Sequence, residues 1–275
     1  MVECRRKIRV KRLIAFFSFL ILAAAAVTAG CGGGKDDKSA YKAVLKEELV
    51  VCTEAAFAPF EYEDKKTGEL RGFDIDLIRA VAKEMGFKKC TVTNMNFDDL
   101  IPAINARKAD VSIAGLSITE ERKKMVFFSK PYYKSGLAFI VRKGVDDVRS
   151  FEDLKTKRVA VQEKTTGALY GEKLQEKGAV LKMYETTDQA LMELMAGNVD
   201  AVICDLPVLQ HFLAVGGSSY ARLAGDPLTE ENYGIMVSKK NLDMVKAVDQ
   251  ALDALKQNGT YDKLYDKWFG AGKAK

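Results

Sequence analysis

Short apolar, β-rich runs alternate with amphipathic stretches along residues 48–115. The first run is Glu48–Thr53. A helix is predicted between Gly72 and Gly86, where apolar residues recur every four positions: Phe73, Leu77, Val81 and Met85. A strand at 90–94, a helix at 98–106 and a strand at 110–114 are expected to follow. This alternation predicts an α/β fold with a mostly parallel sheet covered by helices on both faces.

A second series of the same kind occupies residues 158–204. Strands are expected at 158–161, 181–184 and 199–204, and helices from near Thr166 and over 187–196. The run Ala109–Gly115 aligns with Val199–Asp205, so Gly115 and Asp205 stand at equivalent positions just past a strand. Open α/β sheets bind ligands outside the carboxyl ends of their strands. Two lobes that face each other would bring both positions into one cleft.

The chain is expected to cross twice between the two lobes. The first predicted crossing is residues 133–136, where an aromatic pair and Gly136 allow the backbone to rotate, and the second is residues 229–232. Lobe 1 would comprise residues 46–132 and 233–275, with terminal helices at 241–268, and lobe 2 would comprise residues 137–228. Two crossings between compact lobes are typical of hinge closure around a ligand.

The chain opens with a basic segment and an apolar stretch. Six Lys and Arg residues precede Leu13–Val27, and Thr28-Ala-Gly-Cys31 follows. The stretch is shorter than the roughly 20 apolar residues of a spanning helix and has the layout of an export signal. We predict a signal peptide at 1–30 and a flexible tether at 31–45, anchored by lipid on Cys31. The tetrapeptide resembles a bacterial lipobox, but Thr28 replaces the usual branched aliphatic residue, and cleavage without lipid is the alternative.

Charge and composition narrow the function classes. Residues 1–30 contain six of the 43 basic and one of the 38 acidic residues, which leaves 37 of each in the rest of the chain. The formal charge of +5 therefore belongs to the signal, and nothing in the charge balance points to nucleic acid. About 245 residues remain, enough for two lobes of ordinary size.

The cysteines and the single histidine argue against a metal site. Cys52, Cys90 and Cys204 lack metal-site spacing, and His211 is the one histidine. Cys52 and Cys90 are expected on neighbouring strands, so they form either a disulfide in an oxidising compartment or two buried thiols.

The segment 114–122 predicts an anion site in lobe 1. It leaves a strand and enters a helix, with Ser117 or Thr119 as the cap and Glu120 completing a Ser-x-x-Glu box. Free N–H groups at such a helix start attract anions, and Arg122 one turn further could bind a carboxylate through two hydrogen bonds. The alternative is that Arg122 pairs with Glu121 or another surface acid.

Lobe 2 repeats this arrangement in the loop 162–167. Thr165 and Thr166 would add donors there, or would only cap an ordinary helix. Asp205 would supply a negative charge for a cation, or else cap the helix after Pro207. Phe57 and Phe97 follow strands of lobe 1 and would either stack on a ligand or pack in the core.

Ordered motifs over nearly all of residues 46–270 resemble the extracytoplasmic solute-binding proteins of polar amino-acid ABC importers, family 3, whose members include glutamine-, arginine- and histidine-binding proteins. The motifs are TEAAFAPFE (53–61), GFDIDL (72–77), FDDLIPA (97–103), ITEERKK (118–124), FSKPYY (128–133), NGTY (258–261) and KWFG (267–270). The resemblance implies the two-lobed type II periplasmic-binding-protein fold.

The resemblance also implies a role for each candidate residue. Arg122 would bind the α-carboxylate of the ligand with the backbone around Gly115, Leu116 and Ser117. Asp205 would take the α-ammonium group. The other implied contacts are a carboxylate contact from the threonines, an aromatic sandwich of the ligand side chain, and an acid at its polar end: Thr165, Thr166, Phe57, Phe97 and Glu54. Glu163 and Lys164 depart from the glycine-rich loop of the family.

The expected protein is a tethered extracytoplasmic receptor without cofactor. It would close on an L-amino acid, with arginine or glutamine favoured, and deliver it as a monomer to a permease and ATPase. An acidic ligand is disfavoured, although Lys164 weakens that exclusion. The alternatives are a periplasmic dehydratase on the same fold, which needs a general acid such as Glu54 or Glu163, and the sensing subunit of a signalling receptor.

Overall fold

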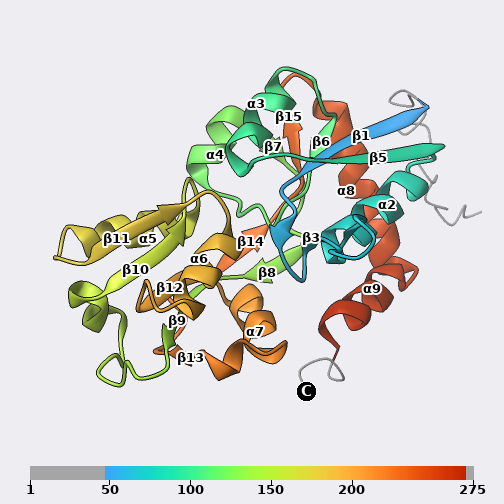
Figure 1. The fold of residues 1–275 in the computed structure, drawn as a ribbon. Coiled ribbons are helices and arrows are strands. Elements are labelled where there is room, and N and C mark those ends of the chain that lie inside the picture. The colour runs from blue at the N-terminus through green and yellow to red at the C-terminus, as the bar shows by residue number, and fades with distance from the viewer. Residues whose placement is uncertain (1–46, 271–275) are drawn as a thin grey trace, which may run out of the picture. The chain divides into compact units, whose positions relative to one another are not determined.

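The computed structural model describes residues 47–270 of the 275-residue chain (Figure 1). The predicted signal peptide, the tether and Cys31 lie outside the described residues. Between residues 47 and 270, no helix has both the length and the apolar character that crossing a membrane requires.

The first lobe contains a five-stranded sheet in the order β5-β1-β6-β15-β7. Its parallel part consists of β1 (Glu48–Thr53) between β5 (Lys89–Asn94) and β6 (Val111–Ser112). Strand β15 (Met236–Ser238) then pairs antiparallel with both β6 and β7 (Val126–Phe128). The mixed α/β class is confirmed, but the sheet is less parallel than the sequence pattern predicted.

The second lobe repeats this design with different segments. Its sheet has the order β11-β10-β12-β9-β13, in which β10 (Arg158–Gln162) lies parallel to β11 (Val180–Tyr184) and β12 (Ala201–Asp205). Strand β9 (Leu137–Arg142) pairs antiparallel with β12 and with β13 (Ala221–Ala224). The long connections are helices: α5 (Thr166–Gln175), α6 (Thr187–Met195) and α7 (Leu206–Ala214).

Each lobe has an aspartate directly before the corresponding strand, and this pair confirms the repeat. Asp110 precedes β6, and its Oδ2 accepts the Val50 N–H at 3.1 Å. Asp200 precedes β12, and its Oδ2 accepts the Arg158 N–H at 3.0 Å. The predicted alignment of residues 109–115 with residues 199–205 therefore corresponds to one structural position in each lobe.

Two short strands connect the lobes. Strand β8 (Tyr133–Ser135) pairs antiparallel with β14 (Glu231–Tyr233), outside both five-stranded sheets. The chain passes from the first sheet to the second through β8 and returns through β14. The two segments touch at Gly136, where an added Cβ would lie 2.1 Å from the Thr229 carbonyl oxygen.

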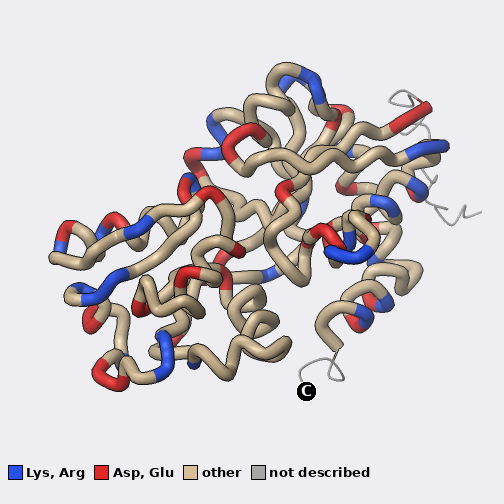
Figure 2. Tube along the Cα trace, viewed as in Figure 1, with Lys and Arg blue, Asp and Glu red and all other residues tan. Residues whose placement is uncertain are grey.

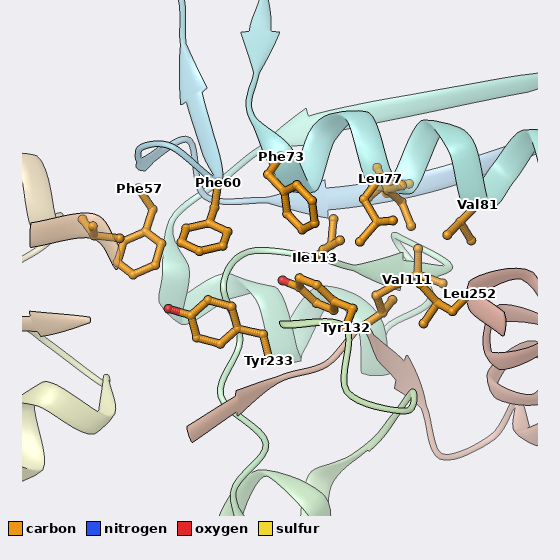
Figure 3. Close-up of a cluster of buried hydrophobic side chains, with 14 of the residues drawn as sticks. Phe57, Phe60, Phe73, Leu77, Val81, Val111, Ile113, Tyr132, Tyr233 and Leu252 are labelled. Carbon is orange, nitrogen blue, oxygen red and sulfur yellow. The ribbon is translucent and has the colours of Figure 1, made fainter. Parts of the chain in front are cut away.

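The helices of the first lobe close its core. One face of α2 (Phe73–Glu84) points Phe73, Leu77 and Val81 at strand β6 and at Tyr132 (Figure 3). Helices α8 (Leu242–Gln257) and α9 (Thr260–Phe269) pack on α2, as predicted for the terminal helices. Short elements complete the description: β2 (Ala56–Phe57), β3 (Glu61–Glu63), β4 (Leu70–Arg71), η1 (Phe97–Asp99), α3 (Leu100–Asn105), α4 (Glu120–Met125), η2 (Phe151–Thr156) and η3 (Gly217–Ser219).

The cysteines of strands β1 and β5 are free thiols, so the disulfide alternative is wrong. Cys90 lies opposite Leu49 in the parallel register of β5 and β1, and Leu49 is three residues before Cys52. Because side chains alternate between the two faces of a strand, Cys52 and Cys90 point to opposite sides of the sheet. Cys52 is buried against α3, and Cys90 packs on the α2 side.

Basic and acidic residues are interspersed along the described chain (Figure 2). This distribution agrees with the near-neutral balance deduced from the sequence.

Candidate functional site

A cavity lies between the carboxyl ends of the parallel strands of the two lobes. It is lined by Glu54, Phe57, Phe97, Ala114, Gly115, Ser117 and Arg122 from the first lobe, and by Gln162, Thr165, Thr166, Gly167, Thr187, Ile203, Cys204 and Asp205 from the second. The structure thus brings nine of the ten predicted ligand-binding residues together. Leu116 is the exception, because its side chain is buried in the core and its carbonyl accepts the Gly234 N–H at 3.0 Å.

The cavity is narrow. Its volume is about 20 Å³, room for roughly one water molecule. One hydrogen bond joins the two lobes beside the cavity, from Arg122 Nη2 to the Lys164 carbonyl at 3.3 Å, and the Gln162 side chain of the second lobe also acts on Glu54 of the first. An amino acid therefore enters only when the cavity walls separate.

Arg122 is held without an acidic partner. Its Nη1 donates to the Ser117 carbonyl at 3.0 Å, and its guanidinium lies 5.3 Å from the centre of the Phe97 ring. Only 9% of the residue is exposed, and among the described residues it forms no ion pair. Burial lowers the pKa of Arg122, and the charges of Asp205 and Glu231 act to raise it.

The structure decides two points about this loop. Glu121 pairs with Lys124 at 2.8 Å, so the alternative that Arg122 pairs with Glu121 is wrong. Thr119, one of the two predicted caps, caps α4 by accepting the Arg122 N–H at 3.1 Å. The Ser-x-x-Glu box is wrong, because the helix begins only at Glu120. The cap places Arg122 in the first turn, with its side chain turned back toward the cavity.

Gly115 supplies space at the cavity wall. Its φ of 52° is left-handed, and an added Cβ would lie 2.6 Å from Cε1 of Phe57. Its N–H donates to Asp74 Oδ2 at 2.9 Å. The Gly115 amide is thereby committed to Asp74 in this structure, whereas the resemblance implied that it would bind the ligand.

Asp205 is positioned by both strands that connect the lobes. The Tyr233 hydroxyl donates to its Oδ1 at 2.7 Å, and the Ser135 hydroxyl lies 3.1 Å from the same oxygen. Asp205 is the N-cap residue of α7, which begins at Leu206, but its side chain accepts no capping hydrogen bond from the helix. Burial raises the pKa of Asp205 to about 7, although the hydrogen bond from Tyr233 acts in the opposite direction.

Glu54 faces the second lobe from the end of β1. It is 4% exposed, and burial raises its pKa to about 7 despite a hydrogen bond with Gln162. Gln162 is fixed in turn, because its Oε1 accepts the Thr187 hydroxyl at 2.8 Å and its Nε2 donates to the Glu185 carbonyl at 3.0 Å. Neither Gln162 nor Thr187 was predicted as a site residue from the sequence. A polar residue that ends the buried strand RVAVQ was the available signal.

The two predicted threonines have different partners. Thr165 caps α5 by accepting the Ala168 N–H at 3.1 Å, in agreement with the alternative that this loop caps a helix. The Thr166 hydroxyl donates to Glu231 Oε2 at 3.0 Å. Glu231, on β14, was not predicted, and its other oxygen accepts the Thr229 hydroxyl at 3.0 Å.

Within residues 47–270, no group of three or more His, Cys, Asp or Glu side chains could hold a metal ion. The outer groove beside the cavity contains Glu163 and Lys164, which do not line the cavity itself.

Known proteins are similar to this chain in sequence and fold. The family model of bacterial extracellular solute-binding proteins, family 3, matches residues 49–271. The arginine-binding periplasmic protein of Mannheimia haemolytica is 35% identical over 226 residues, which are 80% of this chain and 91% of that protein.

Solved structures agree with the sequence match. An ancestral arginine-binding protein, bound to arginine and again to glutamine, is 42% identical, with TM-scores of 0.78 and 0.77, and covers 82% of this chain and 99% of its own. An ancestral amino acid-binding protein, a precursor of cyclohexadienyl dehydratase, is 35% identical with a TM-score of 0.76 over 84% of this chain and 99% of its own. The protein therefore belongs to the bacterial extracellular solute-binding proteins of family 3.

Proposed function

We propose that this protein is the substrate-binding component of an ABC importer and captures a polar L-amino acid, with arginine or glutamine favoured. The observation that carries the proposal is the placement of one buried cation and two buried acids, Arg122, Asp205 and Glu54, around one cavity. A zwitterion presents a carboxylate and an ammonium group at a fixed separation. Burying both is tolerated only when each meets its counter-charge.

This geometry supports a role for each of the site residues. Arg122 binds the α-carboxylate, with Ser117, Thr165 and Thr166 beside it, and Asp205 binds the α-ammonium group. Phe57 and Phe97 enclose the ligand side chain, and Glu54 meets its end. Charge-assisted hydrogen bonds of about 1.5–3 kcal/mol each supply much of the roughly 8 kcal/mol that micromolar binding needs.

Closure about β8 and β14 is supported by the two short strands that connect the lobes. We assign residues 133–136 and 229–232 as hinge crossings between lobe 1 (46–132 and 233–275) and lobe 2 (137–228). Because Ser135 and Tyr233 hold Asp205, hinge movement and the ammonium site are linked. The closed form would then be presented to a membrane permease by a receptor that lies outside the cytoplasm, tethered through lipid on Cys31 and monomeric.

Thermal unfolding with each of the twenty L-amino acids tests the proposal. A ligand that binds only the native state raises the stability by about 2.7 kcal/mol at 100 times its Kd. We expect a response to arginine or glutamine that Arg122→Ala and Asp205→Ala abolish. Arg107→Ala, an exposed arginine of the same lobe, is the matched control and should keep the response. A flat response to all twenty would contradict an amino-acid receptor.

A dehydratase on the same fold is the second candidate. It is favoured by one observation, the near-neutral pKa of the cavity acid Glu54, which suits a general acid. We propose binding without turnover. Product formation from a prephenate- or arogenate-like acid, lost in Glu54→Gln, would instead establish an enzyme.

A further inference from the structure

The cavity walls carry more buried acid than buried base. Arg122 is the one Lys or Arg among the lining residues, whereas Glu54 and Asp205 are both acids. Within the described part of the chain, neither acid has a Lys or Arg nitrogen within 4.0 Å. Arg122 itself donates to the carbonyls of Ser117 and Lys164. No fixed cation therefore neutralises Glu54.

The ionisable groups around Glu54 disfavour its charge as well. Asp188 of α6 and Glu185 before it face Glu54 from the second lobe, and both act to raise its pKa. Glu61 of β3 and Cys204 of β12 also interact with Glu54. The Lys65 ammonium acts on Asp188 rather than on Glu54. Gln162 is the neutral partner, and its amide suits either protonation state of the carboxyl group.

Resting on the proposed function, we infer that Glu54 holds a proton before the ligand binds, releases it to solvent when the ligand has a cationic side chain, and keeps it when the side chain is neutral. In the first case the Glu54 O–H bond breaks, the proton passes to the buffer, and the carboxylate pairs with the ligand cation. Glu54 is thus the specificity-determining residue that lets one cavity accept both ligand classes.

The charge count supports this inference. Bound arginine adds a carboxylate, an ammonium and a guanidinium group, so the cations, with Arg122, number three. The anions match them only if both Asp205 and Glu54 are ionised. Bound glutamine or citrulline adds one cation and one anion, and balance then requires a neutral Glu54. An uncompensated charge in a closed cavity is strongly unfavourable, so the protonation state follows the ligand.

Calorimetry at pH 6, in two buffers with different ionisation enthalpies, counts the protons released by the full protein. Arginine and citrulline are the matched probes, because they have nearly the same shape and differ in charge. Both displace any proton from Asp205, so the difference between them isolates Glu54. We expect arginine to release roughly 0.9 more protons than citrulline, given a pKa of about 7 for Glu54. Equal proton counts for the two ligands would overturn the inference while leaving the proposed function standing.

The variant Glu54→Gln assigns the proton to its residue. The difference between the two ligands should vanish, with arginine bound roughly 10- to 100-fold more weakly and citrulline nearly unchanged. Glu163→Gln, an acid of the adjacent loop outside the cavity, should keep the full difference. A difference that survives in Glu54→Gln would overturn the assignment. Absence of binding by both ligands to the native protein would overturn the proposed function and the inference together. The native measurement decides the matter even if a variant fails to fold.

Discussion

At the scale of the residue, two separate features require a glycine at position 115. Its backbone is left-handed, and its missing Cβ gives the Phe57 ring its place at the cavity wall. An alanine there would incur the strain of a positive φ, about 1–2 kcal/mol, and also a contact 2.6 Å from Phe57. The two costs can be separated, because another glycine of the chain has a positive φ without a close contact at its Cβ position.

We predict that Gly115→Ala lowers the stability by more than about 2 kcal/mol and abolishes ligand binding. Gly144→Ala is the matched control: its φ is 85°, but no atom lies within 4 Å of the added Cβ. This control should lose roughly 1 kcal/mol and bind normally. Chemical denaturation and calorimetry on both variants provide the comparison. Equal effects at the two positions would show that Phe57 yields and that steric fit at Gly115 is unimportant.

The residues at the strand ends of the site were easier to predict from the sequence than the residues that hold them in place. Gly115 follows one recognisable strand and Asp205 ends another, so their meeting at the strand ends could be expected from the repeat. Tyr233 and Ser135 contact Asp205 through segments 98 residues apart, and only the folded chain brings them together. Gln162 and Thr187 were missed for the same reason, because their mutual contact depends on how α6 packs beside β10.

At the scale of the element, the start of β12 is fixed by a cluster around Asp200. Its carboxylate accepts the Arg158 N–H and Nε–H, both at 3.0 Å, and Arg158 Nη2 at 2.7 Å. These hydrogen bonds from Arg158 lower the pKa of Asp200 to about 2. The cluster joins β10 to β12 at the strand ends opposite the cavity.

We predict that Asp200→Asn destabilises the protein by about 1–2 kcal/mol and leaves ligand affinity unchanged. The charged form stabilises the fold above the unfolded-state pKa of about 4, and this contribution is lost as the pH falls toward 2. Asp147→Asn removes an exposed acid paired with Lys157 and should change stability by less than about 0.5 kcal/mol. Urea denaturation at pH 7 compares the two. A weakened affinity in Asp200→Asn would show that this cluster also shapes the cavity.

Element order was predictable, whereas part of the strand pairing was not. The local alternation of apolar runs and helical spacing specifies β1, α2 and β5 because each pattern is contained within its own segment. Strands β9, β13 and β15 join their sheets antiparallel through contacts remote in sequence. The periodicity of a single segment does not reveal its partner in the sheet. The prediction of a mostly parallel sheet was therefore right for only half of the strand pairings in each lobe.

At the scale of the whole molecule, buried acids gather where the lobes and their connections meet. Glu54 and Asp205 line the cavity, and Glu61 and Asp74 lie behind it, with Asp74 Oδ2 also accepting the Tyr132 hydroxyl at 2.6 Å. Burial raises the pKa of Asp74 to about 6 and that of Glu61 well above its ordinary value. The fold therefore tolerates these carboxyl groups best when they are protonated.

The sign of the resulting pH dependence follows directly. Each of these acids has a pKa near 4 in the unfolded chain and a higher one in the fold, so unfolding releases protons between about pH 4 and pH 7. Their contribution to stability is complete below pH 4 and is lost as the pH rises through 7. We predict that the free energy of unfolding without ligand falls from pH 5 to pH 7.5.

Replacing both cavity acids, as Glu54→Gln with Asp205→Asn, should reduce this slope, because neither side chain then titrates while Glu61 and Asp74 still do. Saturating arginine should reduce it in the native protein by a similar amount, since the bound ligand ionises the same two groups. Glu163→Gln, outside the cavity, should leave the slope unchanged. Urea denaturation at half-unit pH intervals measures all four conditions. Stability that stays constant or rises between pH 5 and pH 7.5 without ligand would mean that these acids are already ionised in the fold, so the closed cavity must obtain its balancing charge elsewhere.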